Sequence, residues 1–271
     1  MDFKDRIGFG CVGLTTQPSV KHALNILSCA YENGITAFDT APIYGQGYSE
    51  LILGKFSKNK RSKLAITTKF GLGNVKMPTI QPIVALPLNY LRKKLIQSPQ
   101  QPVEHNYVKV PRREISKEQV KFDFYSSLKR LQTSYIDTYL LHEGTPDFLT
   151  DEALEFVFEL KEKGLVRKIG LGVCHKNLED INPKQLINWD ILQYENNYQL
   201  NTGKIYEDFQ DKEHIHHTVL KNVQTNHNAG ELIAKQLVKF PEAKVLFSSS
   251  KCQNIIKNLT DASDIYQTVN L

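Results

Sequence analysis

Stretches typical of β-strands alternate with stretches typical of α-helices along nearly the whole of this 271-residue chain. The expected strands are 6–10, 35–39, 63–69, 135–142, 167–173, 189–194, 214–219 and 243–247. Repeated strand–helix units predict a parallel sheet, and eight of them in about 260 residues favour a closed (β/α)8 TIM barrel. We expect residues 1–271 to form a single barrel domain.

An open, doubly wound sheet is the alternative arrangement of such units. That fold usually carries a Gly-x-Gly-x-x-Gly turn after its first strand. Gly8, Gly10 and Gly13 do not have this spacing. The sequence therefore favours the closed barrel over the open sheet.

Residues 72–113 interrupt the alternation. They contain six of the chain's eleven prolines and show no sustained hydrophobic period. They also carry a net charge of +6, whereas the whole chain carries +5, so the remainder is −1. We interpret 72–113 as a long inserted loop after the third strand, where barrel active sites are built.

Composition excludes several classes of protein. The basic charge is confined to one segment and no nucleic-acid-binding motif accompanies it, so we expect no nucleic-acid partner. No window approaches the ~18 apolar residues of a membrane helix, and the polar N-terminus has no secretory core behind it. The four cysteines are widely separated, which argues against zinc and is typical of a reducing cytoplasm. We therefore expect a cytoplasmic protein.

Four polar side chains fall at three consecutive expected strand ends. Asp39 ends the second strand, and Tyr44 follows in the next loop. Lys69 ends the third strand and His142 the fourth. Each alone is more often a cap, a packed ring or a solvated charge. In a barrel, however, all four would meet at one mouth.

The sequence also resembles the aldo-keto reductase family. The matching segments are 34–45 (GITAFDTAPIYG) with Ser49 and Glu50, 67–71 (TTKFG), 127–137 running into 140–142 (LLH), and 163–170 (KGLVRKIG). The resemblance implies a catalytic tetrad of Asp39, Tyr44, Lys69 and His142. It also implies a nicotinamide cofactor, NADPH or NADH, and a small carbonyl or sugar substrate.

This tetrad is chemically reasonable for carbonyl reduction. Hydride delivery builds negative charge on the substrate oxygen, so an acid is needed there. A lysine ammonium ~4 Å from the phenol would favour the phenolate by roughly 4 kcal/mol at an effective dielectric of ~20. Lys69 is therefore expected to lower the pKa of Tyr44, with desolvation opposing it. Asp39 would hold Lys69, His142 would orient the substrate, and no metal is required.

The resemblance extends less evenly to the cofactor site. Gln193 matches the family's carboxamide-binding glutamine, Thr218–Leu220 its pyrophosphate turn, and 248–254 with Asn258 its adenosine-binding region. The expected cofactor contacts are Gly10, Cys11, Gln193, His217, Thr218, Leu220, Ser248, Ser249, Ser250, Lys251, Asn254 and Asn258. The backbone amides at a helix start would suit phosphate.

Two departures from the family keep other functions open. Gly172 and Val173 replace a polar pair that contacts the carboxamide, and His217 replaces an aromatic ring that stacks on nicotinamide. A cofactor-binding regulatory or scaffold subunit with little turnover is thus the alternative function. A lyase using Lys69 as a Schiff base is a further rival, although Asp39 would keep that lysine charged.

Two smaller features bear on metals and oxidation. His214, His216 and His217 resemble a metal cluster but have no evident Cys or carboxylate partner, so we expect no metal. Cys174 follows the fifth strand, where it could face the mouth, although a packed and inert thiol is the simpler interpretation.

Overall fold

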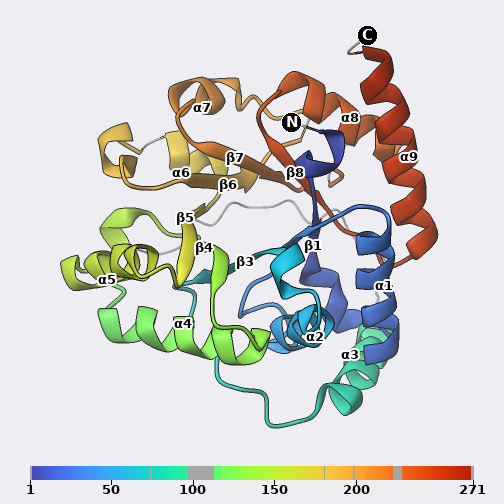
Figure 1. Ribbon diagram of the computed structural model, residues 1–271, viewed down its shortest axis with the longest axis horizontal. Helices are drawn as coiled ribbons and strands as arrows, with labels where there is room; N and C mark the ends of the chain where they lie inside the picture. Colours follow the sequence, from blue (N-terminus) through green and yellow to red (C-terminus); the bar gives the residue numbers. More distant parts are fainter. Residues whose placement is uncertain are drawn as a thin grey trace.

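A computed structural model describes residues 2–73, 75–96, 113–179, 181–197, 199–221 and 228–269. Eight parallel strands close into a barrel, with each strand paired to the next and β8 paired to β1 (Figure 1). They are β1 (Ile7–Gly10), β2 (Ala37–Asp39), β3 (Ala65–Phe70), β4 (Ile136–His142), β5 (Val166–Gly172), β6 (Ile191–Glu195), β7 (Glu213–His217) and β8 (Lys244–Phe247). The predicted (β/α)8 fold is confirmed.

The helices surround this barrel (Figure 1). They are α1 (Val20–Glu32), α2 (Tyr48–Ser57), α3 (Pro82–Ile96), α4 (Lys117–Leu131), α5 (Asp151–Glu162), α6 (His175–Glu179), α7 (Gly203–Asp208), α8 (Ala229–Lys239) and α9 (Cys252–Val269). Their starts are set by local capping. Ser19, Ser116 and Thr150 each accept a backbone N–H of the following turn, and Asn228 forms a full capping box with Glu231.

Strand register brings the important side chains to one rim. Asp39 pairs with Gly10 on one side of β2, and His142 pairs with Gly172 across β4 and β5. Gly172 in turn pairs with Gln193 of β6. Because all strands run in the same direction, their carboxyl ends form a single mouth.

Small residues let the barrel close tightly. A Cβ at Gly170 would lie 2.3 Å from the carbonyl oxygen of Ile191, so only glycine fits between β5 and β6. The barrel interior is filled by Leu140, Ile191, Ile215 and Leu246. Two larger apolar clusters lie between strands and helices and anchor the outer layer.

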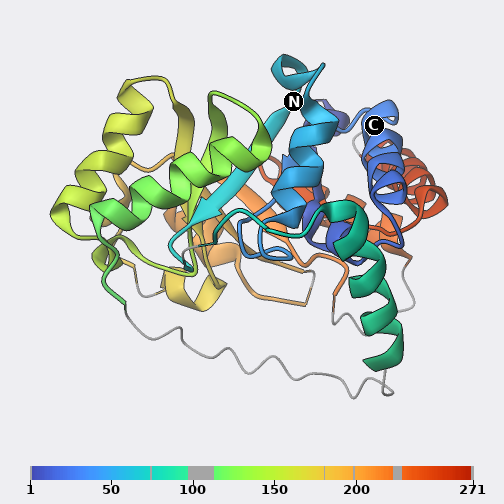
Figure 2. The ribbon, with the colours of Figure 1, turned by 90° about the horizontal axis from the view of Figure 1, so that it is seen from below.

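The insertion after β3 is not structureless, which corrects the expectation for residues 72–113. Residues 82–96 form α3, which packs on the 3-10 helix η2 (Cys11–Thr16) and near α1 and α2 (Figure 2). Pro87 lies inside α3. The sequence did not predict this helix because proline usually breaks helices. Ile83, four residues earlier, whose carbonyl oxygen loses its usual helical partner, is 72% exposed. Residues 97–112 lie outside the described residues.

A buried arginine joins the start of β1 to the connection between α8 and β8. Arg6, just before β1, donates to the carbonyl oxygens of Leu237, Phe240 and Ala243. These carbonyls belong to the end of α8 and the approach to β8. Arg6 thus satisfies backbone groups that the end of α8 leaves unpaired.

Two cysteines that are far apart in sequence lie together. Cys29 of α1 and Cys252 at the start of α9 form a disulfide, with Cα atoms 5.8 Å apart. Their sequence separation of 223 residues gave no sign of this pairing. The disulfide also means that the cysteine pattern cannot serve as an argument for a reducing compartment.

No helix in the described segments is both long enough and apolar enough to cross a membrane. The longest, α9, has 18 residues but a mixed polar and apolar composition.

Candidate active site

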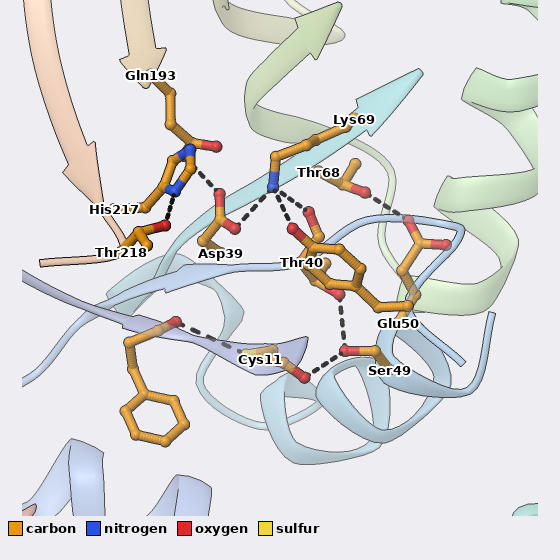
Figure 3. Close-up of polar contacts among 12 residues, drawn as sticks. Cys11, Asp39, Thr40, Ser49, Glu50, Thr68, Lys69, Gln193, His217 and Thr218 are labelled. Carbon is orange, nitrogen blue, oxygen red and sulfur yellow. Dashed lines mark hydrogen bonds and ion pairs between the residues drawn. The ribbon is translucent and has the colours of Figure 1, made fainter. Parts of the chain in front are cut away.

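The structure brings the four predicted catalytic side chains together. Asp39 ends β2, Lys69 is the penultimate residue of β3, His142 ends β4, and Tyr44 lies in the turn before α2. The Nζ atom of Lys69 lies 2.7 Å from Oδ1 of Asp39 and 3.4 Å from the hydroxyl of Tyr44. Figure 3 shows Lys69 reaching Asp39 from the neighbouring strand.

All three N–H donors of the Lys69 ammonium have an acceptor. Besides Asp39 and Tyr44, its Nζ atom donates to the carbonyl oxygen of Thr40 at 3.0 Å. Burial alone would lower the pKa of Lys69, but the Asp39 carboxylate and the Tyr44 hydroxyl outweigh it and the pKa is raised. The lysine is therefore a fixed, charged ammonium rather than a nucleophilic amine.

Two opposing effects set the pKa of Tyr44. Burial raises the pKa of Tyr44, and Lys69 offsets this only in part. Lys69 lowers the pKa of Tyr44, as expected, but the opposing effect of burial is larger and the net shift is upward. The free energy lost by removing the phenolate from water is larger here than the free energy gained from its attraction to the Lys69 ammonium. Tyr44 is thus a protonated hydroxyl at neutral pH, which suits a proton donor.

Two histidines face this centre in neutral form. Burial, aided by the charge of Lys69, lowers the pKa of His142 well below its usual value. Its ring lies edge-on to Tyr44, with centroids 6.2 Å apart. Burial likewise lowers the pKa of His217 to about 4. A neutral imidazole can donate one hydrogen bond at the mouth without adding charge.

A cleft of about 480 Å³ opens above the four residues. All four line it, together with the predicted cofactor contacts Gly10, Gln193, His217, Thr218, Leu220 and Ser248. Ser249, Ser250 and Lys251 continue from Ser248 into the loop before α9, and Asn254 and Asn258 lie on α9. These five residues do not line the cleft, and neither does Cys11, whose side chain is fully buried.

Thr218 adopts a backbone conformation that few residues choose. Its φ of 63° lies in the left-handed region, and its hydroxyl is 2.6 Å from Nδ1 of His217. Such local strain persists only where the surroundings enforce it, often at ligand-binding turns. It falls in the turn that the sequence analysis assigned to pyrophosphate.

Gln193 makes an interaction that the sequence did not predict. Its Nε2 atom donates to Oδ2 of Asp39 at 2.7 Å, so the amide and Lys69 occupy different oxygens of one carboxylate (Figure 3). A Cβ at Gly172 would lie 3.5 Å from Gln193 Oε1. Val173 is completely buried. The end of β5 therefore adds no polar side chain, and Gln193 is the amide available at this part of the rim.

A buried ion pair between Glu50 and Arg130 lies behind β3 and helps to position the site, and the sequence did not predict it. Glu50 accepts from Thr68 at 2.6 Å and from Nε of Arg130 at 2.6 Å, and both charged side chains are fully buried. Thr68 directly precedes Lys69. The pair thus fixes β3 against α2 and α4, which sets where Lys69 points. The spacing of Glu50 after Tyr44 was visible in sequence, but its partner 80 residues later was not.

A second buried relay fixes the turn after β2. Thr40 donates to Ser49 at 2.8 Å, and Ser49 donates to the carbonyl oxygen of Cys11 at 3.0 Å (Figure 3). The relay ties the ends of β1 and β2 to the start of α2. Tyr44 lies on the segment that these hydrogen bonds enclose, so its position depends on them.

Cys174, His175 and Glu195 form a cluster whose ligand atoms lie within 4.8 Å of one another. The thiol of Cys174 lies 2.9 Å, and Nδ1 of His175 2.8 Å, from the same oxygen of Glu195. Burial, aided by Glu195, raises the pKa of Cys174 to about 12. This thiol is therefore protonated and unreactive, in agreement with the interpretation of Cys174 as an inert thiol.

His214 and His216, which the sequence placed in a possible metal cluster, make structural contacts. His214 is hydrogen-bonded to Tyr194 and to the carbonyl oxygen of Phe209. His216 contacts the hydroxyl of Tyr194 and the amide of Gln236. Burial lowers the pKa of both imidazoles, so they are neutral members of a packed network.

Comparisons with known proteins agree with this geometry. A family model described as the aldo/keto reductase family matches residues 6–237. The chain is 31% identical over 172 residues to an uncharacterized oxidoreductase of Bacillus subtilis, YqkF, covering 64% of this chain and 46% of that protein. It is 30% identical over 154 residues to the aldo-keto reductase YhdN of Bacillus subtilis, covering 56% and 37%. The chain thus spans less than half the length of these curated relatives.

A solved structure supports the fold. The holo form of an aldo-keto reductase from Bacillus halodurans superposes with a TM-score of 0.66 at 20% identity, covering 98% of this chain and 91% of that one. The family match extends over most of the barrel, from Arg6 into α8. This chain belongs to the aldo/keto reductase family.

Proposed function

We propose that this protein is a nicotinamide-dependent oxidoreductase that reduces an aldehyde or ketone, or oxidises the matching alcohol or sugar. The observation that carries the proposal is one hydrogen-bonded series within the cleft. Gln193 and Lys69 share the Asp39 carboxylate, and Lys69 reaches the Tyr44 hydroxyl. A protonated phenol beside a fixed ammonium is suited to proton transfer to a developing alkoxide.

The cleft fits a nicotinamide cofactor. Oε1 of Gln193 lies beside Gly172 and can accept from a carboxamide, since Nε2 is engaged by Asp39. Thr218 supports a pyrophosphate turn, and Ser248 leads from the cleft to the start of α9. When bound, the reduced cofactor supplies the hydride that is added to the carbonyl carbon.

The chain's own residues would handle the proton. Tyr44 donates its hydroxyl proton to the substrate oxygen, and the ammonium of Lys69 stabilises the phenolate left behind. Asp39 keeps Lys69 charged and directed at Tyr44. Neutral His142 donates a hydrogen bond to the substrate oxygen and so orients the carbonyl.

We favour NADPH as the cofactor, with NADH the alternative. The exposed ammonium of Lys251 stands at the start of α9, next to Ser249, whose hydroxyl accepts the Lys251 backbone N–H at 3.2 Å. A cation and a helix start together suit a 2′-phosphate. The ratio of the NADPH and NADH dissociation constants measures this preference.

The experiment pairs Tyr44→Phe with Tyr48→Phe. Tyr48 loses only a hydrogen bond to the carbonyl oxygen of Ile80, outside the tetrad. Turnover of a small aldehyde should fall at least about a thousandfold in Tyr44→Phe, within the usual size of general acid catalysis, and stay near normal in Tyr48→Phe. Cofactor affinity, followed by fluorescence titration, should be unchanged in both. An active Tyr44→Phe enzyme would refute the mechanism.

One observation favours a second candidate, a cofactor-binding scaffold subunit with little turnover. Gly172 and the buried Val173 offer the cofactor no polar side chain, which weakens one part of the site. The two functions separate in a simple assay. Tight cofactor binding without turnover of any small aldehyde would favour the scaffold, whereas turnover by the isolated protein would favour the enzyme.

A further inference from the structure

The disulfide between Cys29 and Cys252 lies next to the part of the cleft that we assign to the cofactor. Cys252 is the first residue of α9 and directly follows Lys251 in the loop 248–251. Cys29 lies on α1, a helix that plays no part in the tetrad. The bond therefore ties the expected 2′-phosphate loop to a neighbouring helix.

A weaker contact from α1 reaches the same loop. Nε2 of His22, in the first turn of α1, lies 3.5 Å from the carbonyl oxygen of Ser250. His22 and Cys29 are two helical turns apart, so they lie on the same face of α1. Loop 248–251 and the start of α9 are thus both positioned against α1, with the disulfide as the only covalent link between them in the described chain.

The rest of α9 is anchored elsewhere. Gly230 of α8 lets the middle of α9 approach closely, since a Cβ there would lie 2.4 Å from that of Asp261. In the first turn of α9, residues 252–254 are exposed and Ile255 is buried. Without the disulfide, the first turn would be held by Ile255, and loop 248–251 by its internal hydrogen bonds and the His22 contact.

We propose that Cys29 and Cys252 form a reversible redox modification site whose disulfide form increases affinity for the adenosine half of the cofactor. This inference rests on the proposed cofactor site. With the bond formed, loop 248–251 is held in place before binding, so less conformational entropy is lost when the cofactor binds. Reduction releases the loop and weakens binding.

The chemistry is exchange with a small disulfide such as oxidised glutathione. The exposed Cys252 thiolate attacks one sulfur of that disulfide, and the first glutathione thiol leaves. The Cys29 thiolate then attacks the Cys252 sulfur and displaces the second thiol. Two protein thiols are oxidised, one disulfide is reduced to two thiols, and their protons pass to solvent and leaving groups. Cys29 is 5% exposed, so Cys252 is the point of entry.

The test compares two states of the same full-length protein. One sample is treated with oxidised glutathione and the other with dithiothreitol, and alkylation with mass measurement identifies which cysteines are free. Each is titrated with NADPH and with nicotinamide mononucleotide, which lacks the adenosine half. We expect the dissociation constant for NADPH to rise about tenfold on reduction, a common size for coupled sites, and that for the mononucleotide to stay constant.

Cysteine variants provide matched controls. Cys29→Ser should bind NADPH like the reduced protein after either treatment, while Cys174→Ser should respond to redox state like the wild type. Both replace a thiol by a hydroxyl, but Cys174 does not pair with another cysteine. A response lost in Cys174→Ser and kept in Cys29→Ser would contradict the proposal.

The outcomes separate this inference from the proposed function. Equal NADPH affinity in both redox states, or Cys29 and Cys252 remaining free after oxidation, overturns the redox site and leaves the oxidoreductase intact. Failure of both states to bind NADPH or NADH overturns the proposed function and the coupling with it. A shift for NADPH alone supports both.

Discussion

Gln193 donates a 2.7 Å hydrogen bond to Asp39, which lies 154 positions away in the sequence. Asp39 is the carboxylate that also binds Lys69, so both of its oxygens accept a hydrogen bond. Lys69 uses Oδ1 and Gln193 uses Oδ2, both in a buried setting. This pairing gives Gln193 a positioning role besides its proposed contact with the carboxamide. It links the proposed cofactor side of the cleft to the side proposed for proton transfer.

We expect Gln193→Leu to impair turnover as well as cofactor binding. Asp39 would lose a charge-assisted hydrogen bond worth about 1.5–3 kcal/mol. The Lys69 ammonium would then be held less firmly in its position beside Tyr44. Each ~1.36 kcal/mol is a factor of ten, so kcat should fall roughly ten- to hundredfold. Gln193→Glu places a second carboxylate against Asp39 and should be worse. A change confined to cofactor affinity, with kcat intact, would remove the positioning role.

The pH dependence of the two directions should differ. Because the pKa of Tyr44 is raised and that of His142 is lowered well below its usual value, neither group titrates across the neutral range. Single-turnover reduction should therefore be flat through neutral pH and decline only in strong alkali. Alcohol oxidation needs the phenolate and should rise steadily with pH. A reduction rate that halves around the usual histidine pKa would contradict this assignment.

The Glu50–Arg130 pair offers a test of stability and site support together. Removing one partner, as in Arg130→Met, leaves an uncompensated buried charge and should cost about 3–5 kcal/mol of unfolding free energy in denaturant titrations. The double variant Glu50→Leu with Arg130→Met should recover much of this loss. The surface pair Lys163–Glu159 is the control, and Lys163→Met should leave the unfolding free energy nearly unchanged, because water and salt screen an exposed pair. Equal effects at the two sites would contradict the prediction.

Asp123 should make stability depend on pH. Burial raises the pKa of Asp123 from 3.8 to about 6, although its Oδ2 accepts the N–H of Gly71. A raised carboxyl pKa contributes stability that is present below 3.8 and is lost as pH rises through about 6. Relative to Asp123→Asn, the wild type should lose up to about 3 kcal/mol between about pH 4 and about pH 7. An invariant difference between the two proteins would refute this shift.

Much of the fold was predictable because its signals are local. The strand expected over 135–142 is observed as β4 (Ile136–His142), and the strand expected over 167–173 is observed as β5 (Val166–Gly172). The helix α3 was missed because Pro87 outweighed the apolar pattern around it.

The tetrad could be located from sequence, but its energetics could not. Strand ends and family resemblance put Asp39, Tyr44, Lys69 and His142 at one mouth without knowledge of their distances. The direction of the Tyr44 pKa depends on burial, which only the folded chain defines. Long-range partners, such as Arg130 for Glu50 and Cys252 for Cys29, leave no local pattern because folding alone brings them together.

Barrel closure has a consequence for how this chain is made. β1 is synthesised before all the other strands of the barrel, yet its second neighbour is β8, and Arg6 bonds to carbonyl oxygens more than 230 residues later. Until residue 247 has been synthesised, β1 therefore keeps an open edge and Arg6 lacks its acceptors. Nascent chains stalled before β8 should expose that edge and be bound by chaperones, whereas completion of the last strand converts them to a closed and protease-resistant form.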